Sequence, residues 1–160
     1  MKKLLFFLLP VLFMTCSSDE NDDFDHGGLQ LELTKFTINF NTQDSDLKNV
    51  GTYKIFSKPR LSGEFLPKKG LYVVHGENGI KAYSTECPYI DEKNIRGGIY
   101  IFEGQTEFSC SYGNGGTCNS HFNSNTGLPT SGPAKDHNLR LLEYKVTPQE
   151  QTGVYLITND

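Results

Sequence analysis

Hydrophobic and polar positions alternate along this chain in short runs, which is the period of a half-buried β-strand. In the first third of the chain, such runs occupy residues 29–33, 36–40 and 53–56. No window of about 12 residues combines helical spacing of apolar side chains with capping residues. The pattern therefore predicts a chain built almost entirely of strands.

Three pairs of runs predict antiparallel hairpins with short turns between them. These pairs are residues 71–75 with 79–83, residues 99–102 with 106–109, and residues 141–146 with 154–157. The length of 160 residues suits one domain. We expect an all-β fold, a small antiparallel sandwich or barrel, over residues 29–160.

Two long polar segments interrupt this pattern, at residues 84–98 and 110–138, and we expect both to be loops. Together they contain Cys87, Cys110 and Cys118, which are all the cysteines beyond Cys16. Long structureless loops in a compact domain usually carry function, or are held by a covalent or metal link. The candidate chemistry of the chain therefore lies in these two segments.

The composition excludes several classes of protein. The formal net charge of −4 argues against a nucleic-acid-binding protein, which normally presents a basic face. No apolar stretch approaches the roughly 20 residues of a membrane-spanning helix. Neither a Gly-x-Ser-x-Gly motif, nor a phosphate-binding glycine loop, nor a paired-carboxylate signature is present. We expect an electron carrier or a binding module, not an enzyme with its own catalytic motif.

The first residues have the make-up of a secretory signal. Lys2 and Lys3 precede an apolar run of about 11 residues, which ends at Thr15 and Cys16. This segment resembles a bacterial lipoprotein signal, with Phe13 and Thr15 at positions that usually hold Leu and a small residue. The resemblance implies a signal peptide over residues 1–15 and a lipid on Cys16.

The polar stretch that follows Cys16 resembles the surface-export signal of Bacteroidetes lipoproteins. It is rich in serine and acidic residues, and together with Cys16 it gives a tether over residues 16–28. We therefore expect an extracytoplasmic protein at the outer membrane or cell surface, held to the membrane through its lipid alone. Thiols can oxidise in such a compartment.

With Cys16 lipidated, Cys87, Cys110 and Cys118 remain, and this odd number leaves one thiol outside any single disulfide. Cys118 and His121 have Cys-x-x-His spacing, which allows two ligands from one tight loop to reach the same metal. A site with three thiolates and one imidazole would use all three cysteines.

The order of several segments resembles the Rieske [2Fe–2S] domain over about residues 70–158. The segments are residues 82–88 after a strand, residues 103–110, residues 122–134 and a final strand pair. The most specific are Thr126-Gly127 and Ser131-Gly132-Pro133-Ala134. With its signal, the chain looks like the Rieske-like lipoproteins of Bacteroidetes.

The resemblance implies single-electron transfer through a [2Fe–2S] cluster held at the tip of the two loops, with a redox partner docking at that tip. Family members ligate the cluster with two cysteines and two histidines. Here Cys87 would serve on the first loop, and Cys110 or Cys118 would serve with His121 on the second. The chain departs from the family at Tyr89, where the first loop has its histidine, and a phenol is a poor replacement for imidazole.

Three chemical arrangements remain open for Cys87, Cys110, Cys118 and His121. The four residues ligate an iron–sulfur cluster, or they hold zinc as a three-Cys, one-His tetrahedron. Alternatively, Cys110 and Cys118 form a disulfide, and the chain is a cluster-free binding or structural lipoprotein.

Overall fold

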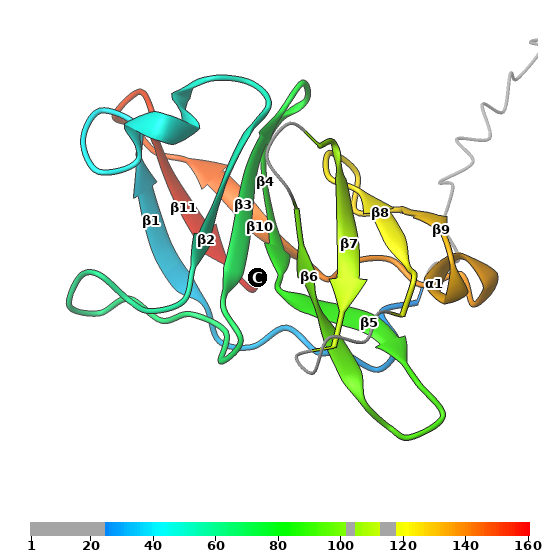
Figure 1. Ribbon diagram of the computed structural model, residues 1–160. Helices are drawn as coiled ribbons and strands as arrows, with labels where there is room; N and C mark the ends of the chain where they lie inside the picture. Colours follow the sequence, from blue (N-terminus) through cyan, green and yellow to red (C-terminus); the bar gives the residue numbers. More distant parts are fainter. Residues whose placement is uncertain (1–24, 102–104, 113–117) are drawn as a thin grey trace, which may run out of the picture.

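The computed structural model describes residues 25–101, 105–112 and 118–160. The signal peptide, Cys16 and most of the tether, which are predicted from residues 1–24, lie outside the described residues. The regular secondary structure of the described chain is almost entirely β-strand (Figure 1), as the sequence pattern predicts. No helix in this part of the chain is long and apolar enough to cross a membrane.

The strands form two antiparallel sheets, which stand left and right in Figure 1. The first has the order β1-β11-β10-β4-β3-β2 and the second has the order β5-β6-β7-β8-β9. The elements of the first sheet are β1 (Lys35–Asn39), β2 (Thr52–Phe56), β3 (Leu71–Gly76), β4 (Gly79–Ser84), β10 (Glu143–Pro148) and β11 (Val154–Thr158), with the 3-10 turn η1 (Ser45–Lys48) beside β2. Those of the second are β5 (Glu86–Ile90), β6 (Arg96–Tyr100), β7 (Glu107–Ser111), β8 (His121–Asn123) and β9 (Pro129–Ser131), followed by the short helix α1 (Pro133–Asp136).

All three predicted hairpin pairings are confirmed. Strands β3 and β4 pair around the predicted turn, β6 pairs with β7, and β10 pairs with β11. The predicted strand at residues 53–56 is β2, and the one at residues 36–40 is β1.

The strand predicted at residues 29–33 is wrong, because this segment forms no strand. Leu31 and Leu33 are 39% and 66% exposed, so the alternation there faces solvent and stabilises no sheet face. The interpretation of residues 84–98 and 110–138 as loops is also wrong. The first segment holds β5 and the start of β6, and the second holds the end of β7, β8, β9 and α1. Their polar residues sit on short strands whose order is fixed by pairing.

Side-chain alternation on β3 divides the interior into two cores. Leu71 and Val73 point to one face of the sheet, while Tyr72 and Val74 point to the other, and all four are buried. The face of Leu71 contributes to the inner core, which comprises Phe36, Ile38, Phe40, Leu47, Phe56, Leu71, Val73, Ala82, Tyr144 and Ile157. The face of Tyr72 contributes to the intersheet core, which comprises Tyr72, Val74, Tyr83, Cys87, Ile99, Ile101, Phe108, Cys110, Cys118, Phe122, Ala134, Leu139 and Leu141.

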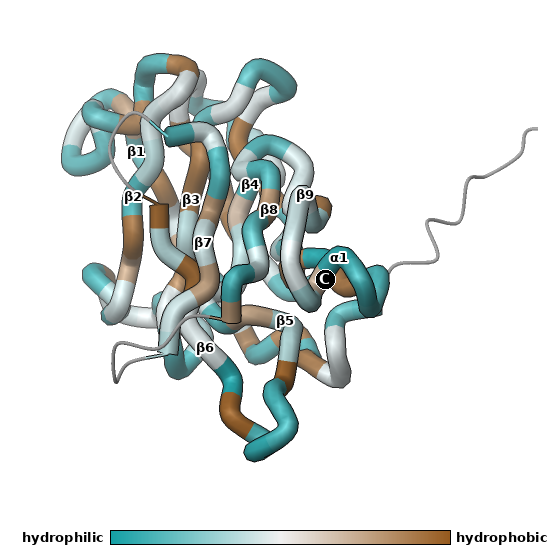
Figure 2. The backbone as a smooth tube through the Cα atoms, turned by 45° about the vertical axis from the view of Figure 1, so that its right-hand side comes forward, coloured by the Kyte–Doolittle hydropathy of each residue, from teal (hydrophilic) through white to brown (hydrophobic). Residues whose placement is uncertain are grey.

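Aromatic contacts join the two sheets across the intersheet core. The ring centroid of Phe108 on β7 lies 4.8 Å from that of Tyr72 and 6.0 Å from that of Tyr83. The backbone N–H of Ile101 donates to the Tyr72 hydroxyl at 3.3 Å. These contacts fix the position of the second sheet against the first. The β5–β6 hairpin projects beyond the body of the molecule (Figure 2).

Candidate functional site

The three cysteines of the two predicted loops meet in the intersheet core. Cys87 lies on β5, Cys110 lies on β7 and Cys118 lies just before β8. Their Sγ atoms are all within 4.8 Å of one another, and the residues are only 0%, 1% and 6% exposed. We call Cys87, Cys110 and Cys118 the sulfur cluster. The structure therefore brings together three of the four residues predicted as ligands.

Gly97 makes this convergence possible. Strand β6 lies between β5 and β7, so sulfur atoms from the outer two strands must approach each other over β6. A Cβ atom at Gly97 would lie 2.6 Å from Cys110 Sγ and 2.7 Å from the backbone oxygen of Ser111. Since real Cβ atoms do not come so close to such neighbours, a side chain here would push Cys110 away.

Cys110 and Cys118 form a disulfide, with their Cα atoms 5.7 Å apart. This separation is ordinary for a disulfide. Of the three arrangements left open by the sequence, the structure contains the one with this bond. The Gly-rich stretch that the bond encloses falls largely within residues 113–117, which lie outside the described residues.

Among the cysteines that the structure describes, Cys87 is the one outside the disulfide. Its Sγ atom lies 3.8 Å from that of Cys118. Burial raises the pKa of the Cys87 thiol to about 11, although a hydrogen bond from the Tyr89 backbone N–H and the charge of Arg96 act in the opposite direction. The thiol is therefore protonated at neutral pH, in contact with a disulfide.

His121, the fourth predicted ligand, lies outside the sulfur cluster. On β7, Phe108 and Cys110 point into the core, whereas Ser109 points to the opposite face. His121 pairs with Ser109 in the β7–β8 register and shares that outer face. Its Nδ1 atom lies 3.3 Å from Ser109 Oγ and 4.0 Å from a carboxylate oxygen of Glu107, and its side chain is 40% exposed. Among the described residues, no histidine joins the three sulfurs.

Tyr89, which stands where the Rieske family has its first histidine, packs at the rim of the intersheet core. Its ring stacks on that of His137, which follows α1, with centroids 5.8 Å apart. Both residues line an open cavity of about 440 Å³ together with Asp25, Asp91 and Glu92. We call this cavity the tip cavity.

The end of the tether is packed beside the tip cavity. Asp25 forms backbone hydrogen bonds with Asn138 at 3.0 Å and Arg140 at 2.9 Å. The Arg96 guanidinium donates to the carbonyl of Gly27 and, at 2.8 Å, to that of Pro88. Residues 25–28 are thus joined to the strand that carries Cys87.

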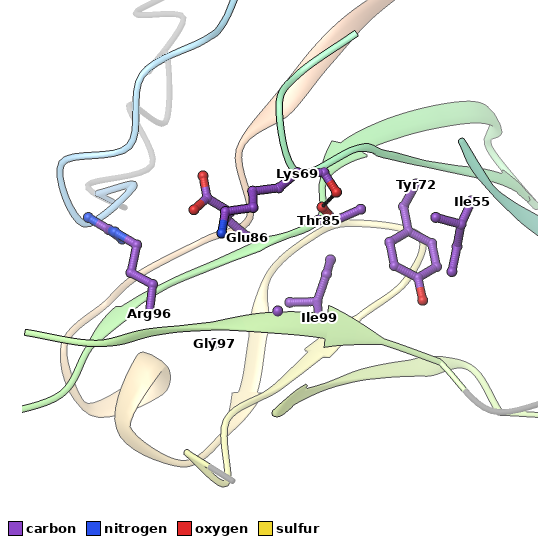
Figure 3. A pocket seen from close by; sticks show the side chains of 9 residues that line it. Ile55, Lys69, Tyr72, Thr85, Glu86, Arg96, Gly97 and Ile99 are labelled. Atoms are coloured by element: carbon purple, nitrogen blue, oxygen red, sulfur yellow. Dashed lines mark hydrogen bonds between the residues drawn. The ribbon is translucent and has the colours of Figure 1, made fainter. Parts of the chain in front are cut away.

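A second cavity, of about 370 Å³, lies beside β5 and β6 (Figure 3). Tyr72 and Ile55 stand at one end of it, and Glu86 and Arg96 stand toward the other. Gly97 lines this cavity as well as making room for Cys110, so it is common to both sites.

Sequence reasoning did not single out Arg96 and Gly97. The signal that would have found them is the pair Gly97-Gly98 at the start of a strand, because glycine inside a strand often marks a close approach of neighbouring chain. The contact of His137 with Tyr89 depends on the packing of α1 against β5, which no local sequence pattern indicates.

The described residues do not fit the ligand set of a Rieske cluster. Such a cluster takes two thiolates and two imidazoles. Among the described residues, the site offers three sulfurs and no imidazole, and two of the sulfurs are bonded to each other.

No family model matches the chain, and no curated protein matches it significantly. Among solved structures, it is similar to the ferredoxin of carbazole 1,9a-dioxygenase from Nocardioides aromaticivorans IC177. That match has 16% sequence identity and a TM-score of 0.42, and it covers 77% of this chain and 97% of the ferredoxin. At these values the match carries no functional inference to this chain.

Proposed function

We propose that this protein is a lipid-anchored, extracytoplasmic binding module that holds no [2Fe–2S] cluster. The observation that carries the proposal is the Cys110–Cys118 disulfide, which occupies two of the three thiols that a cluster would need. Two further features support it: Tyr89 replaces an imidazole, and His121 faces away from the sulfurs.

The proposed binding surface is the tip cavity, where two aromatic rings and three carboxylates line one open hollow. A rigid scaffold that presents polar and aromatic groups on connecting segments is a common design for recognition. Hydrogen bonds of residues 25–28 link the segment that follows α1, which carries His137, to the strand that carries Cys87. The partner proposed here is a protein or small molecule that docks at the tip, and no nucleic acid is expected.

The first experiment measures metal, sulfide and thiols in the full chain, purified anaerobically in detergent. We expect no iron and no acid-labile sulfide, a disulfide that maps to Cys110 and Cys118, and a thiol at Cys87 that reacts with an alkylating agent only after denaturation. Two irons and two sulfides per chain, with a visible absorption spectrum, would contradict the proposal. That outcome would establish electron transfer, the function implied by the Rieske resemblance.

The second experiment tests the anchor. In a bacterial host that processes lipoproteins, the wild-type chain is expected in the membrane fraction, with a mass increase from acyl chains on Cys16. The matched variant Cys16→Ser removes the acylated atom and leaves the folded domain unchanged, so it should carry no lipid. Equal membrane association without acyl mass in both chains would contradict lipid anchoring.

A further inference from the structure

We infer that the reduced sulfur cluster is a three-coordinate site for one soft, thiophilic cation of the Cu(I) type. The proposed binding module contains the Cys110–Cys118 disulfide, whereas this inference concerns the same cysteines in their reduced state. It therefore goes beyond the proposed function. It starts from a feature that a disulfide alone does not explain: a third sulfur, Cys87, in contact with the pair.

The donor set selects the cation. The group contains sulfur only, with no imidazole or carboxylate among the described residues that join it. Structural zinc sites almost always take four ligands, whereas soft thiolates alone suit Cu(I). Three sulfurs in a plane around one metal, at bond lengths of about 2.3 Å, stand about 4 Å apart. The 3.8 Å between Cys87 Sγ and Cys118 Sγ agrees with this spacing.

Burial disfavours the Cys87 thiolate, but two neighbouring groups offset part of that effect. The backbone N–H of Tyr89 donates to its sulfur, and the positive charge of Arg96 lies close enough to stabilise the anion. Arg96 is held there by hydrogen bonds to the Cys87 and Pro88 carbonyls at 3.4 and 2.8 Å. These groups offset part of the negative charge that three thiolates bring into the core.

Gly97 leaves room for the sulfur cluster on β6. A Cβ atom there would lie 2.6 Å from Cys110 Sγ, which stands within 4.8 Å of Cys87 Sγ. Cys110 Sγ has this position while it is bonded to Cys118, so a side chain at residue 97 would disturb both the disulfide and the approach of Cys87.

Loading the site takes two balanced steps. A dithiol reductant first donates two electrons and two protons to the Cys110–Cys118 bond, which gives two thiols and leaves the reductant as its own disulfide. The cation then forms three metal–sulfur bonds and displaces the protons of Cys87, Cys110 and Cys118 to solvent.

The test uses the full chain, reduced with a dithiol that is removed under anaerobic conditions. Cu(I) is titrated in competition with a chromophoric Cu(I) chelator, and the stoichiometry is read by native mass spectrometry. We expect one Cu(I) per chain. Cys87→Ser should weaken binding by more than about 100-fold, while His121→Ala and Cys16→Ser should leave it unchanged.

Folding of the Cys87→Ser variant is checked by reoxidation, which should restore the Cys110–Cys118 disulfide. Equal Cu(I) affinity in the wild type and Cys87→Ser would overturn the inference, because two sulfurs would then suffice. A loss in His121→Ala as large as that in Cys87→Ser would also overturn it, since a four-ligand site would be indicated. Iron and sulfide in the chain as isolated would instead contradict the proposed function, so the two failures are distinguishable.

Discussion

The ionisable groups buried in the two cores have different partners and opposite pKa shifts. At the edge of the inner core, the fully buried carboxylate of Asp44 receives hydrogen bonds from Arg60 at 2.6 and 3.0 Å and from the Asn39 backbone N–H at 3.0 Å. Burial alone would raise the pKa of Asp44, but these hydrogen bonds and the charge of Arg60 lower it. In the intersheet core, by contrast, burial raises the pKa of Cys87, and the Tyr89 backbone N–H and the charge of Arg96 offset only part of that effect.

Asp44 therefore stabilises the fold through its ion pair and hydrogen bonds, whereas Cys87 makes no comparable stabilising interaction. The Asp44–Arg60 pair is completed by Phe36 and Phe56, whose ring centroids lie 4.6 and 4.8 Å from the guanidinium carbon. The contribution of this ion pair to the stability of the fold explains why Asp44 is buried there. Cys87 is protonated at neutral pH and packs in the core as a small apolar side chain, so its contact with the Cys110–Cys118 disulfide is what distinguishes it.

The largest loss of stability is expected from a substitution at the edge of the inner core. Asp44→Ala leaves the Arg60 guanidinium partly buried without its carboxylate, so we expect a loss of about 3 kcal/mol in the free energy of unfolding. Urea unfolding measures it. The matched control is Asp46→Ala, because Asp46 pairs with Lys54 at 3.0 Å but is 58% exposed. Similar losses in the two variants would remove the distinction between the cores.

The second largest loss of stability is expected when the Cys110–Cys118 disulfide is removed. Cys110→Ala opens a short loop with a sequence separation of eight residues, and the chain-entropy model then gives a loss of about 2.5 kcal/mol. A reductant should lower the unfolding free energy of the wild type by a similar amount and leave that of Cys110→Ala unchanged. A wild type that is insensitive to reductant would show that the bond does not stabilise the domain.

The third prediction concerns the close approach of Cys110 Sγ to Gly97 on β6. Gly97→Ala places a methyl group 2.6 Å from Cys110 Sγ, so we expect a loss of about 2 kcal/mol from overpacking. Gly98→Ala is the matched control, because its added Cβ would meet nothing closer than the Thr85 carbonyl oxygen at 3.6 Å. Urea unfolding of both variants compares them. Equal stability would contradict the tight approach at Gly97.

The smallest effect is a pH dependence. Burial raises the pKa of Cys87 to about 11 in the folded chain, from an ordinary value of 9.0, so the unfolded thiol loses its proton first as the pH rises. Stability from this group is therefore complete below about pH 9 and decreases up to about pH 11. At pH 10, we expect the wild type to have lost about 1 kcal/mol more than Cys87→Ala, relative to pH 8. Parallel pH profiles of the two chains would contradict a buried neutral thiol.

Strand pairing within hairpins was predictable, because it depends on local alternation and on turns such as the one between β3 and β4. The strands β5, β8 and β9 were not, since β8 and β9 have only three residues each and β5 shows no regular alternation, so all three depend on neighbours in the sheet. The reverse error occurred at residues 29–33, where a good alternating pattern meets no sheet partner.

The candidate site divides in the same way. The sequence determined which side chains are available: three cysteines after Cys16, a histidine three positions beyond Cys118, and a tyrosine at position 89. Only the tertiary structure decided that Cys110 bonds to Cys118 and that Cys87 joins them, because this depends on the order of β5, β6 and β7 and on the gap at Gly97. It also decided the place of His121, since residue spacing sets how far a side chain can reach, whereas sheet register sets which face it occupies.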